Sequence, residues 1–243
     1  MLISQQQSSP STLPLIPGVW RANQLAISRT TNCSTGFSQL DQELPGAGWP
    51  QSTLIELLCQ QPGIGEMQLL KPVLTGLSQT QKIALVQPPY TPQAMAGKNW
   101  GLCVDNLLWI KPAAAADGLW AAEQILKHGC CGAVIVWQSH IRNEALRRLH
   151  LAAQSTDTWL WLMRPLAVRN DASPAPLRLA LRPAIGGVML DIVKRRGPVS
   201  DQALYISLAD MPASRHHFRE DHAPVVVRTP SSVTARSTAS LLV

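Results

Sequence analysis

One loop of this chain has the setting of a phosphate-binding site but lacks the side chains that carry out its chemistry. Residues 52–59 are an apolar run typical of a buried strand, and residues 69–77 have the apolar periodicity of a helix. The functional motif between such a strand and helix is G-x-x-x-x-G-K-[ST]. The loop reads Gln60-Gln61-Pro62-Gly63-Ile64-Gly65-Glu66-Met67. Gln60 thus replaces the first glycine, and Glu66 and Met67 replace the lysine and the hydroxyl residue.

These replacements remove the two functions of the motif. Its lysine contacts the β- and γ-phosphates, and its hydroxyl binds Mg²⁺. Two unit charges about 4 Å apart interact with about 4 kcal/mol at an effective dielectric constant of about 20, so Glu66 turns attraction into repulsion of similar size. Glu66 can instead satisfy the partial positive charge of the helix N-terminus. Two interpretations follow: a phosphate-binding loop that no longer handles nucleotide, or a glycine-rich strand–helix turn that never did.

Composition limits the classes of function. The chain has 243 residues, of which 46% are hydrophobic, and a net charge of +6, which favours acidic partners and nucleic acid above all. The N-terminus lacks the basic and apolar regions of a secretion signal, and no apolar run is long enough to span a membrane, so we expect a cytoplasmic protein. The five cysteines form no CxxC pair and the C-terminal histidines lack a fixed setting, so we expect no metal or other cofactor.

Strand and helix patterns alternate through the middle of the chain. After residues 69–77, strands are predicted at 82–87, 107–110, 133–137 and 158–163, and helices at 92–100, 117–128 and 143–153. Asp117 is the expected N-cap of the second of these helices, and Glu144 the expected partner of Arg148 in the third. Alternation of this kind predicts a parallel sheet flanked by helices. Two alternating runs, 177–182 and 188–194, then predict an antiparallel hairpin.

These patterns divide the chain into four segments. Residues 1–17 are rich in Gln, Ser and Pro and are predicted to be disordered, and residues 18–50 form a short helix and a lead-in segment. Residues 51–200 form the α/β domain with its hairpin, and residues 201–243 are predicted to be a flexible tail.

Residues 35–165 resemble the core of RecA, and the letters of Asp105-Asn106-Leu107-Leu108 match directly. The resemblance implies a RecA-like fold with a phosphate-binding loop. It also places three further residues at positions that serve nucleotide chemistry in that family. Trp137 stands where the Walker B strand ends in Asp, Pro89 falls near the catalytic Glu, and Ala96 falls where an aromatic ring stacks on adenine. Together with Glu66 and Met67, these residues imply that the nucleotide site is lost and that the protein is not an enzyme.

Within this group the chain looks most like the ImuA family of translesion-synthesis-associated proteins, relatives of the division inhibitor SulA. The similarity lies in Trp20-Arg21, 36–41, 44–74, 119–137, 145–153, 163–165, 173–182 and 194–197. It implies an accessory protein of SOS mutagenesis that binds ImuB, a Y-family-like protein, and supports the DnaE-type polymerase ImuC, with RecA or DNA as further candidate partners. The alternatives are a SulA-like inhibitor that binds FtsZ and, third, a RecA-type ATPase with an atypical loop.

Two sets of side chains are candidates for contacts with partners. The basic residues Arg147, Arg148, Lys194, Arg195 and Arg196 are candidates for DNA contact, because Lys and Arg neutralise phosphates, although a solvated helix face and hairpin end would look the same. Trp20 and Trp49 lie outside the predicted strands and are candidates for a partner surface, since Trp is enriched among interface anchors. The alternative for Trp20 is that it docks on its own domain.

Overall fold

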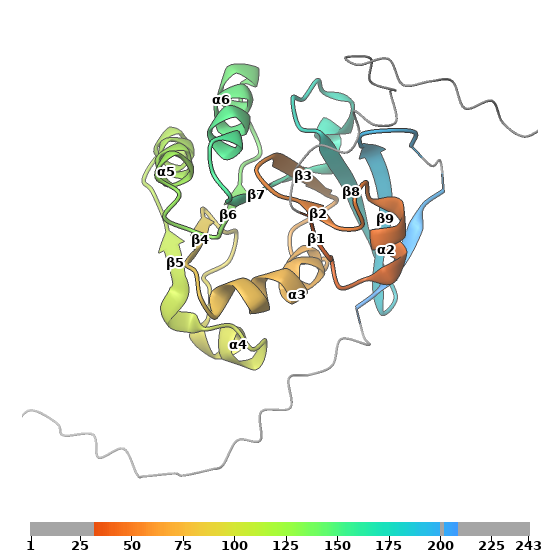
Figure 1. The fold of residues 1–243 in the computed structure, drawn as a ribbon, viewed down its shortest axis with the longest axis horizontal. Helices are drawn as coiled ribbons and strands as arrows, with labels where there is room; N and C mark the ends of the chain where they lie inside the picture. The colour runs from red at the N-terminus through yellow and green to blue at the C-terminus, as the bar shows by residue number, and fades with distance from the viewer. Residues whose placement is uncertain (1–31, 200–201, 209–243) are drawn as a thin grey trace, which may run out of the picture.

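The computed structural model describes residues 32–199 and 202–208, and its centre is an eight-stranded mixed sheet in the order β10-β9-β8-β3-β7-β6-β4-β5 (Figure 1). Trp20, the predicted disordered segment 1–17 and most of the predicted tail lie outside the described residues. The strands are β3 (Leu54–Cys59), β4 (Ile83–Val86), β5 (Leu107–Ile110), β6 (Ala133–Trp137), β7 (Trp159–Pro165), β8 (Leu177–Ala184), β9 (Gly187–Lys194) and β10 (Leu204–Ser207). A separate two-stranded ribbon joins β1 (Asn32–Cys33) to β2 (Trp49–Pro50).

The sheet is mostly parallel, as predicted. Strand β3 pairs in parallel with both β7 and β8, and β6 pairs in parallel with β7 and β4. The predicted hairpin is also confirmed, because β9 runs antiparallel to β8. Strand β10 adds to the outer edge of β9, so the assignment of residues 204–207 to a flexible tail was wrong. Pairing with β9 and the burial of Ile206 hold this short segment in the sheet.

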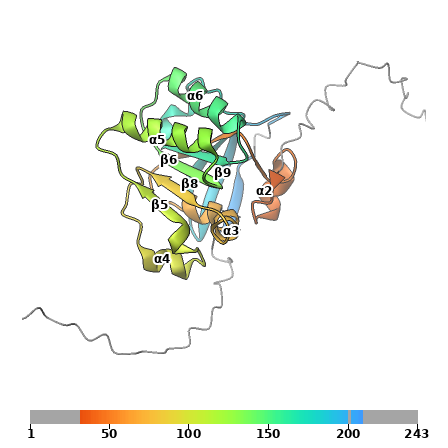
Figure 2. The same ribbon diagram turned by 60° about the vertical axis from the view of Figure 1, so that its left-hand side comes forward.

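Helices cover both faces of the sheet (Figure 2). They are α2 (Ser38–Glu43), α3 (Glu66–Ser78), α4 (Ala94–Asn99), α5 (Ala115–His128) and α6 (Asn143–Gln154), with short 3₁₀ turns η1 (Val104–Asn106) and η2 (Leu166–Asn170). Leucines of α3 pack in one apolar cluster, and residues of α5 and α6 pack in a second cluster on the opposite face. Because the central strands are buried on both sides, β6 is continuously apolar, and β3 is apolar except for Glu56. In the described part of the chain, no helix is long and apolar enough to cross a membrane.

Two local helix predictions were wrong. Helix α5 begins at Ala115, so Asp117 lies in its first turn, where a carboxylate favours the helix dipole, and is not the N-cap. In α6, Arg148 pairs with Glu123 of α5 instead of Glu144, because the two helices lie side by side on the same face. The predicted end of α5 is confirmed, since Gly129 adopts a left-handed conformation with φ of 59°.

Candidate functional site

The altered loop lies at the carboxyl end of β3, where ligands bind in open α/β sheets. Gly63 and Gly65 both have positive φ, at 82° and 120°, which turns their backbone N–H groups toward the inside of the loop. A Cβ atom on Gly65 would lie 2.4 Å from Cδ1 of Leu208 and 3.1 Å from Cγ1 of Val188. Conformation and close packing therefore both require glycine at position 65. Helix α3 begins directly after it, so its N-terminus points at the loop.

The carboxylate of Glu66 occupies the space where this loop would bind an anion. Its Oε1 accepts a hydrogen bond from the Gly63 N–H at 2.8 Å, and its Oε2 accepts one from the Gly65 N–H at 3.2 Å. The side chain is only 3% exposed. Backbone N–H groups and a helix N-terminus form an anion site when they are free. Here the chain supplies its own anion, and a second one would meet a buried negative charge.

The negative charge of Glu66 also affects the pKa of Cys59, the last residue of β3. Burial, and to a smaller extent the nearby carboxylate of Glu66, raise the pKa of its thiol to about 12. A thiol in this state stays protonated at neutral pH and is a poor nucleophile. The loop therefore has neither a cation for phosphate nor a reactive thiolate.

The other altered positions line or flank an apolar groove beside the loop. The groove has a volume of about 350 Å³ and runs from Gly63 and Gly65 past the segment that follows β4 to Trp137 at the end of β6. Pro89, Trp137 and Ala96 of α4 all line this groove. Met67 packs against the core beneath, whereas Gln60 is exposed and its N–H binds the carbonyl of Leu181. The predicted residues other than Gln60 thus lie together along a groove suited to apolar groups.

Replacing Glu66 by glutamine is expected to lower the free energy of unfolding by about 1–3 kcal/mol, because one charge-assisted acceptor for the loop N–H groups is lost. The variant is also expected not to bind Mg²⁺–ATP, since no lysine or hydroxyl residue is restored. Urea unfolding and calorimetric titration with Mg²⁺–ATP measure the two effects. The control is Gln68→Ala at an exposed position of the same helix, with a change of at most about 0.5 kcal/mol. Measurable ATP binding by Glu66→Gln would show that the loop still recognises nucleotide.

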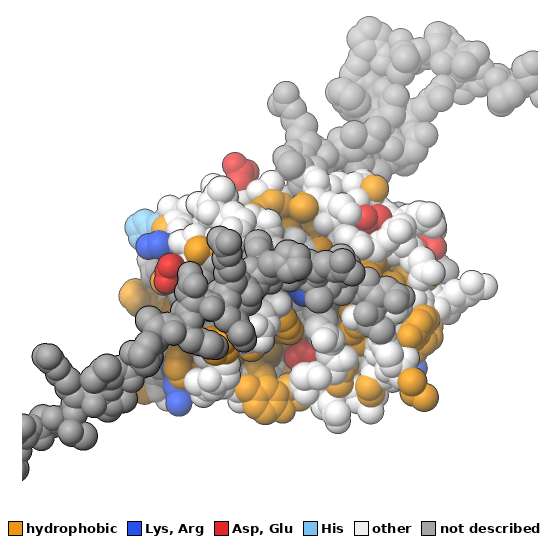
Figure 3. Space-filling view, turned by 90° about the horizontal axis from the view of Figure 1, so that it is seen from below, with side chains coloured by type: hydrophobic (Ala, Val, Ile, Leu, Met, Phe, Trp, Pro, Cys, Tyr) orange, Lys and Arg blue, Asp and Glu red, His pale blue; other side chains and the backbone are white. Residues whose placement is uncertain are grey.

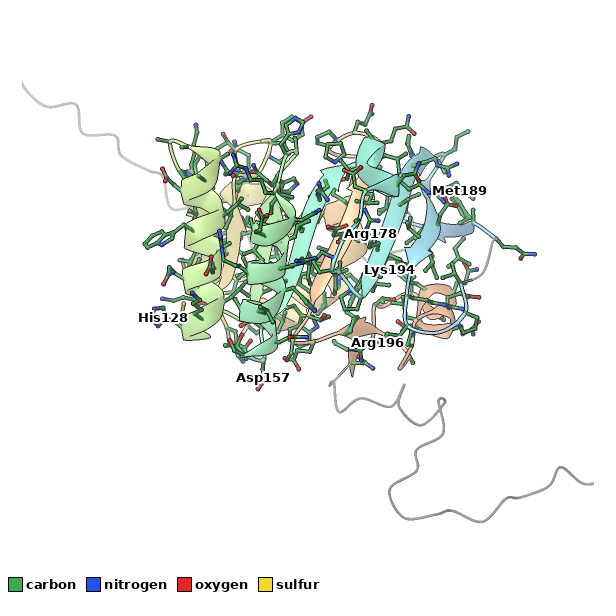
Figure 4. All side chains as sticks on the ribbon, turned by 90° about the horizontal axis from the view of Figure 1, so that it is seen from above. His128, Asp157, Arg178, Met189, Lys194 and Arg196 are labelled. Atoms are coloured by element: carbon green, nitrogen blue, oxygen red, sulfur yellow. The ribbon has the colours of Figure 1, made fainter. Side chains whose placement is uncertain are left out.

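The basic residues predicted to contact DNA do not form one surface. Arg195 is mostly buried and donates to the backbone carbonyl and to the carboxylate of Glu43, so it fastens α2 to the end of β9. Arg148 faces α5 through Glu123, and Arg147 is exposed on α6. Lys194 and Arg196 are exposed on the face that carries α5 and α6 (Figure 4). Lys194 and Arg196 lie together as a positive patch, since the charges of both act on His150.

His150 of α6 lies within the field of that patch. Its Nδ1 accepts a hydrogen bond from the Leu54 N–H at 3.4 Å, which joins α6 to the start of β3. Burial first, then the charges of Arg196 and Lys194, lower the pKa of His150. The folded protein therefore holds this imidazole neutral under conditions in which the unfolded chain protonates it.

Stability is accordingly expected to fall as the pH drops below about 6.5, the ordinary pKa of histidine, because the unfolded chain then binds more protons than the folded one. His150→Asn, which keeps an acceptor for the Leu54 N–H, is expected to reduce this loss. Urea unfolding at pH values of about 7 and about 5 gives the comparison. His128→Asn, an exposed change at the end of α5, serves as the control. Equal pH dependence in His150→Asn and the unmodified protein would contradict the assignment.

Trp49 lies in the core and not on the surface, contrary to the sequence-based prediction. It is fully buried, and its ring meets that of Trp161 edge to face with centroids 6.0 Å apart. The ribbon of β1 and β2 places Trp49 against the sheet, a contact that no local pattern shows. Trp109 and Trp120 are the exposed tryptophans of the described residues.

Sequence reasoning missed a buried charge network. Glu56 of β3 lies between Arg164 of β7 and Arg178 of β8, and all three side chains are buried. The signal in the sequence is a single acidic residue within an otherwise apolar strand, together with arginines at the end or start of two others. No group of residues suited to hold a metal ion occurs in the described part of the chain.

Comparisons with known proteins find similarity among solved structures. No protein-family model matches the chain, and no curated protein matches it. Among solved structures, the chain is similar to the crystal structure of SulA from Pseudomonas aeruginosa, with 24% sequence identity and a TM-score of 0.40. The similarity covers 46% of this chain and 97% of that one.

Proposed function

We propose that this protein is a non-catalytic accessory factor of error-prone translesion synthesis that binds ImuB and thereby supports the DnaE-type polymerase ImuC. One observation carries the non-catalytic part: the carboxylate of Glu66 occupies the anion-binding loop and accepts hydrogen bonds from its N–H groups. A polyphosphate would have to displace a buried charge without gaining a lysine. The RecA-like ancestry of the domain, which the sequence resemblance implies, belongs to the same proposal.

The apolar groove is the surface that we assign to ImuB. By the sequence resemblance to RecA, it corresponds to the place where a nucleotide-binding relative would hold the base and phosphates. Proline and aromatic side chains contribute to its wall. Tyr90 stands at its rim with 67% of its surface exposed. Figure 3 shows the molecule from below, the side of α3 and α4 in Figure 1, and hydrophobic side chains cover more of the visible surface there than charged ones do. A groove of this character fits an apolar segment of a protein partner better than nucleic acid.

The choice of ImuB rests on the family resemblance of the sequence, and an affinity pull-down from DNA-damaged cells tests it. The tagged full chain is expected to recover ImuB and the DnaE-type polymerase, with nuclease treatment leaving that recovery unchanged if DNA does not bridge the proteins. Recovery of FtsZ without ImuB would contradict the proposal and favour a division inhibitor on the same inactive site.

Tyr90→Asp is expected to weaken ImuB binding at least about tenfold, because it places a charge in an apolar contact. Surface plasmon resonance with purified ImuB measures the affinity. Trp120→Asp is the matched control, since Trp120 is 64% exposed on α5, on the opposite face of the sheet. An equal loss of ImuB affinity in both variants, or no loss in either, would show that the groove is not part of the interface. The identity of the partner would still be tested by the pull-down.

A further inference from the structure

Two buried guanidinium groups share one carboxylate beneath η2. Oε2 of Glu56 accepts a hydrogen bond from Nε of Arg178 at 2.6 Å. Oε1 accepts one from the hydroxyl of Ser173 at 2.9 Å and lies 3.4 Å from Nη1 of Arg164. The network therefore contains one positive charge more than negative charge. Arg178 lies on the face seen in Figure 4.

Each guanidinium nitrogen of Arg178 donates a hydrogen bond, whereas Nε of Arg164 has no partner among the described residues. The terminal nitrogens of Arg178 donate to three backbone carbonyls, those of Val168, Arg169 and Asp171. Arg164 has only the long contact with Glu56, and its Nε is buried without a hydrogen-bond partner among the described residues. A buried cation with so little compensation is costly, so its presence needs an explanation.

Arg164 lines a cavity of about 330 Å³ that could hold the missing anion. One wall is the segment Ser139–Arg142, which leads into α6, and the other wall is η2 and Asp171. Helix α6 has twelve residues and no side-chain cap at its N-terminus, so its first N–H groups are available. Arg142 adds a positive charge to the cavity, and Asp171 is the acidic side chain that lines it.

We propose that this cavity binds a terminal phosphoryl group, either as free phosphate or as the phosphorylated end of a longer molecule. Arg164 lies deep, with 4% of its side chain exposed, so the phosphate of a continuous diester backbone does not reach it, whereas a terminal group does. A planar guanidinium and a helix N-terminus are both suited to phosphate oxygens. The site differs from the Glu66 loop, because there the chain already provides the anion.

Calorimetric titration of the full chain with inorganic phosphate, at constant ionic strength, tests the proposal. Arg142→Ala is expected to weaken binding by about tenfold, as the loss of one charge-assisted hydrogen bond does. Arg164→Gln is expected to abolish binding, and Arg142→Ala keeps the test decisive if the buried variant does not fold. Arg147→Ala removes the same charge from an exposed position of α6 outside the cavity and is expected to change nothing.

A second titration distinguishes free phosphate from the phosphorylated end of a longer molecule. It compares one oligonucleotide sequence with a 5′-phosphate and with a 5′-hydroxyl. Tighter binding of the phosphorylated form, lost in Arg142→Ala, assigns the site to nucleic acid ends. Binding of inorganic phosphate alone, with no difference between the oligonucleotides, assigns it to a small anion. Absence of phosphate binding at about 10 mM, or equal affinity in Arg142→Ala and Arg147→Ala, overturns the proposal.

Discussion

Replacing Glu56 by glutamine is expected to lower the free energy of unfolding by about 3–5 kcal/mol, because it leaves two buried guanidinium groups without a counter-charge. Glu56 is fully buried, and its two partners lie on neighbouring strands β7 and β8. Glutamine has nearly the same shape, so the loss reports the charge and not the packing. Arg178 would keep its bonds to the backbone of η2, and the cost would fall mainly on Arg164.

Urea unfolding followed by circular dichroism measures this loss. Glu123→Gln is the matched control, because Glu123 also accepts from two cations, Lys127 and Arg148, but both of these are more than half exposed. Exposed pairs contribute at most about 1 kcal/mol. Similar changes in the two variants would mean that water reaches Glu56 and that the network is not a dry one. The proposed phosphate site would then lose its buried, under-compensated cation.

Trp49→Ala is expected to cost about 3–5 kcal/mol, the range for removing a large aromatic side chain from a core. Trp49 is fully buried and packs edge to face on Trp161, with 88° between the ring planes. The change would leave a cavity between the β1–β2 ribbon and the sheet. Loosening of that ribbon would also disturb α2, whose Leu40 belongs to the same cluster.

Thermal and urea unfolding measure the effect, with Trp120→Ala at an exposed position as the control and an expected change within about 0.5 kcal/mol. The milder variant Trp49→Phe separates packing from binding, because it fills most of the space. Its affinity for ImuB is expected to equal that of the unmodified protein. A large loss of ImuB affinity in a stably folded Trp49→Phe protein would show that Trp49 contributes to partner binding after all.

Local pattern was sufficient for most of the secondary structure. The mainly apolar run at 52–59 predicted the buried strand β3, the continuous apolar run at 133–137 predicted β6, and Gly129 predicted the end of α5. The alternating runs 177–182 and 188–194 predicted the β8–β9 hairpin. These features depend on residues a few positions apart, so the chain itself displays them. The short strand β10 was missed because its pairing with β9, and not its own four residues, stabilises it.

The sequence by itself determined that the loop after β3 lacks the lysine and hydroxyl residue of a phosphate-binding loop, since those are residue identities at adjacent positions. Only the tertiary structure decided that the Glu66 carboxylate fills the loop, that Trp49 is core and that Arg195 is held by Glu43. It also decided that Glu56 meets residues 108 and 122 positions away. The physical reason is that burial and ion pairing depend on which strands become neighbours, and strand order is set by packing of the whole sheet.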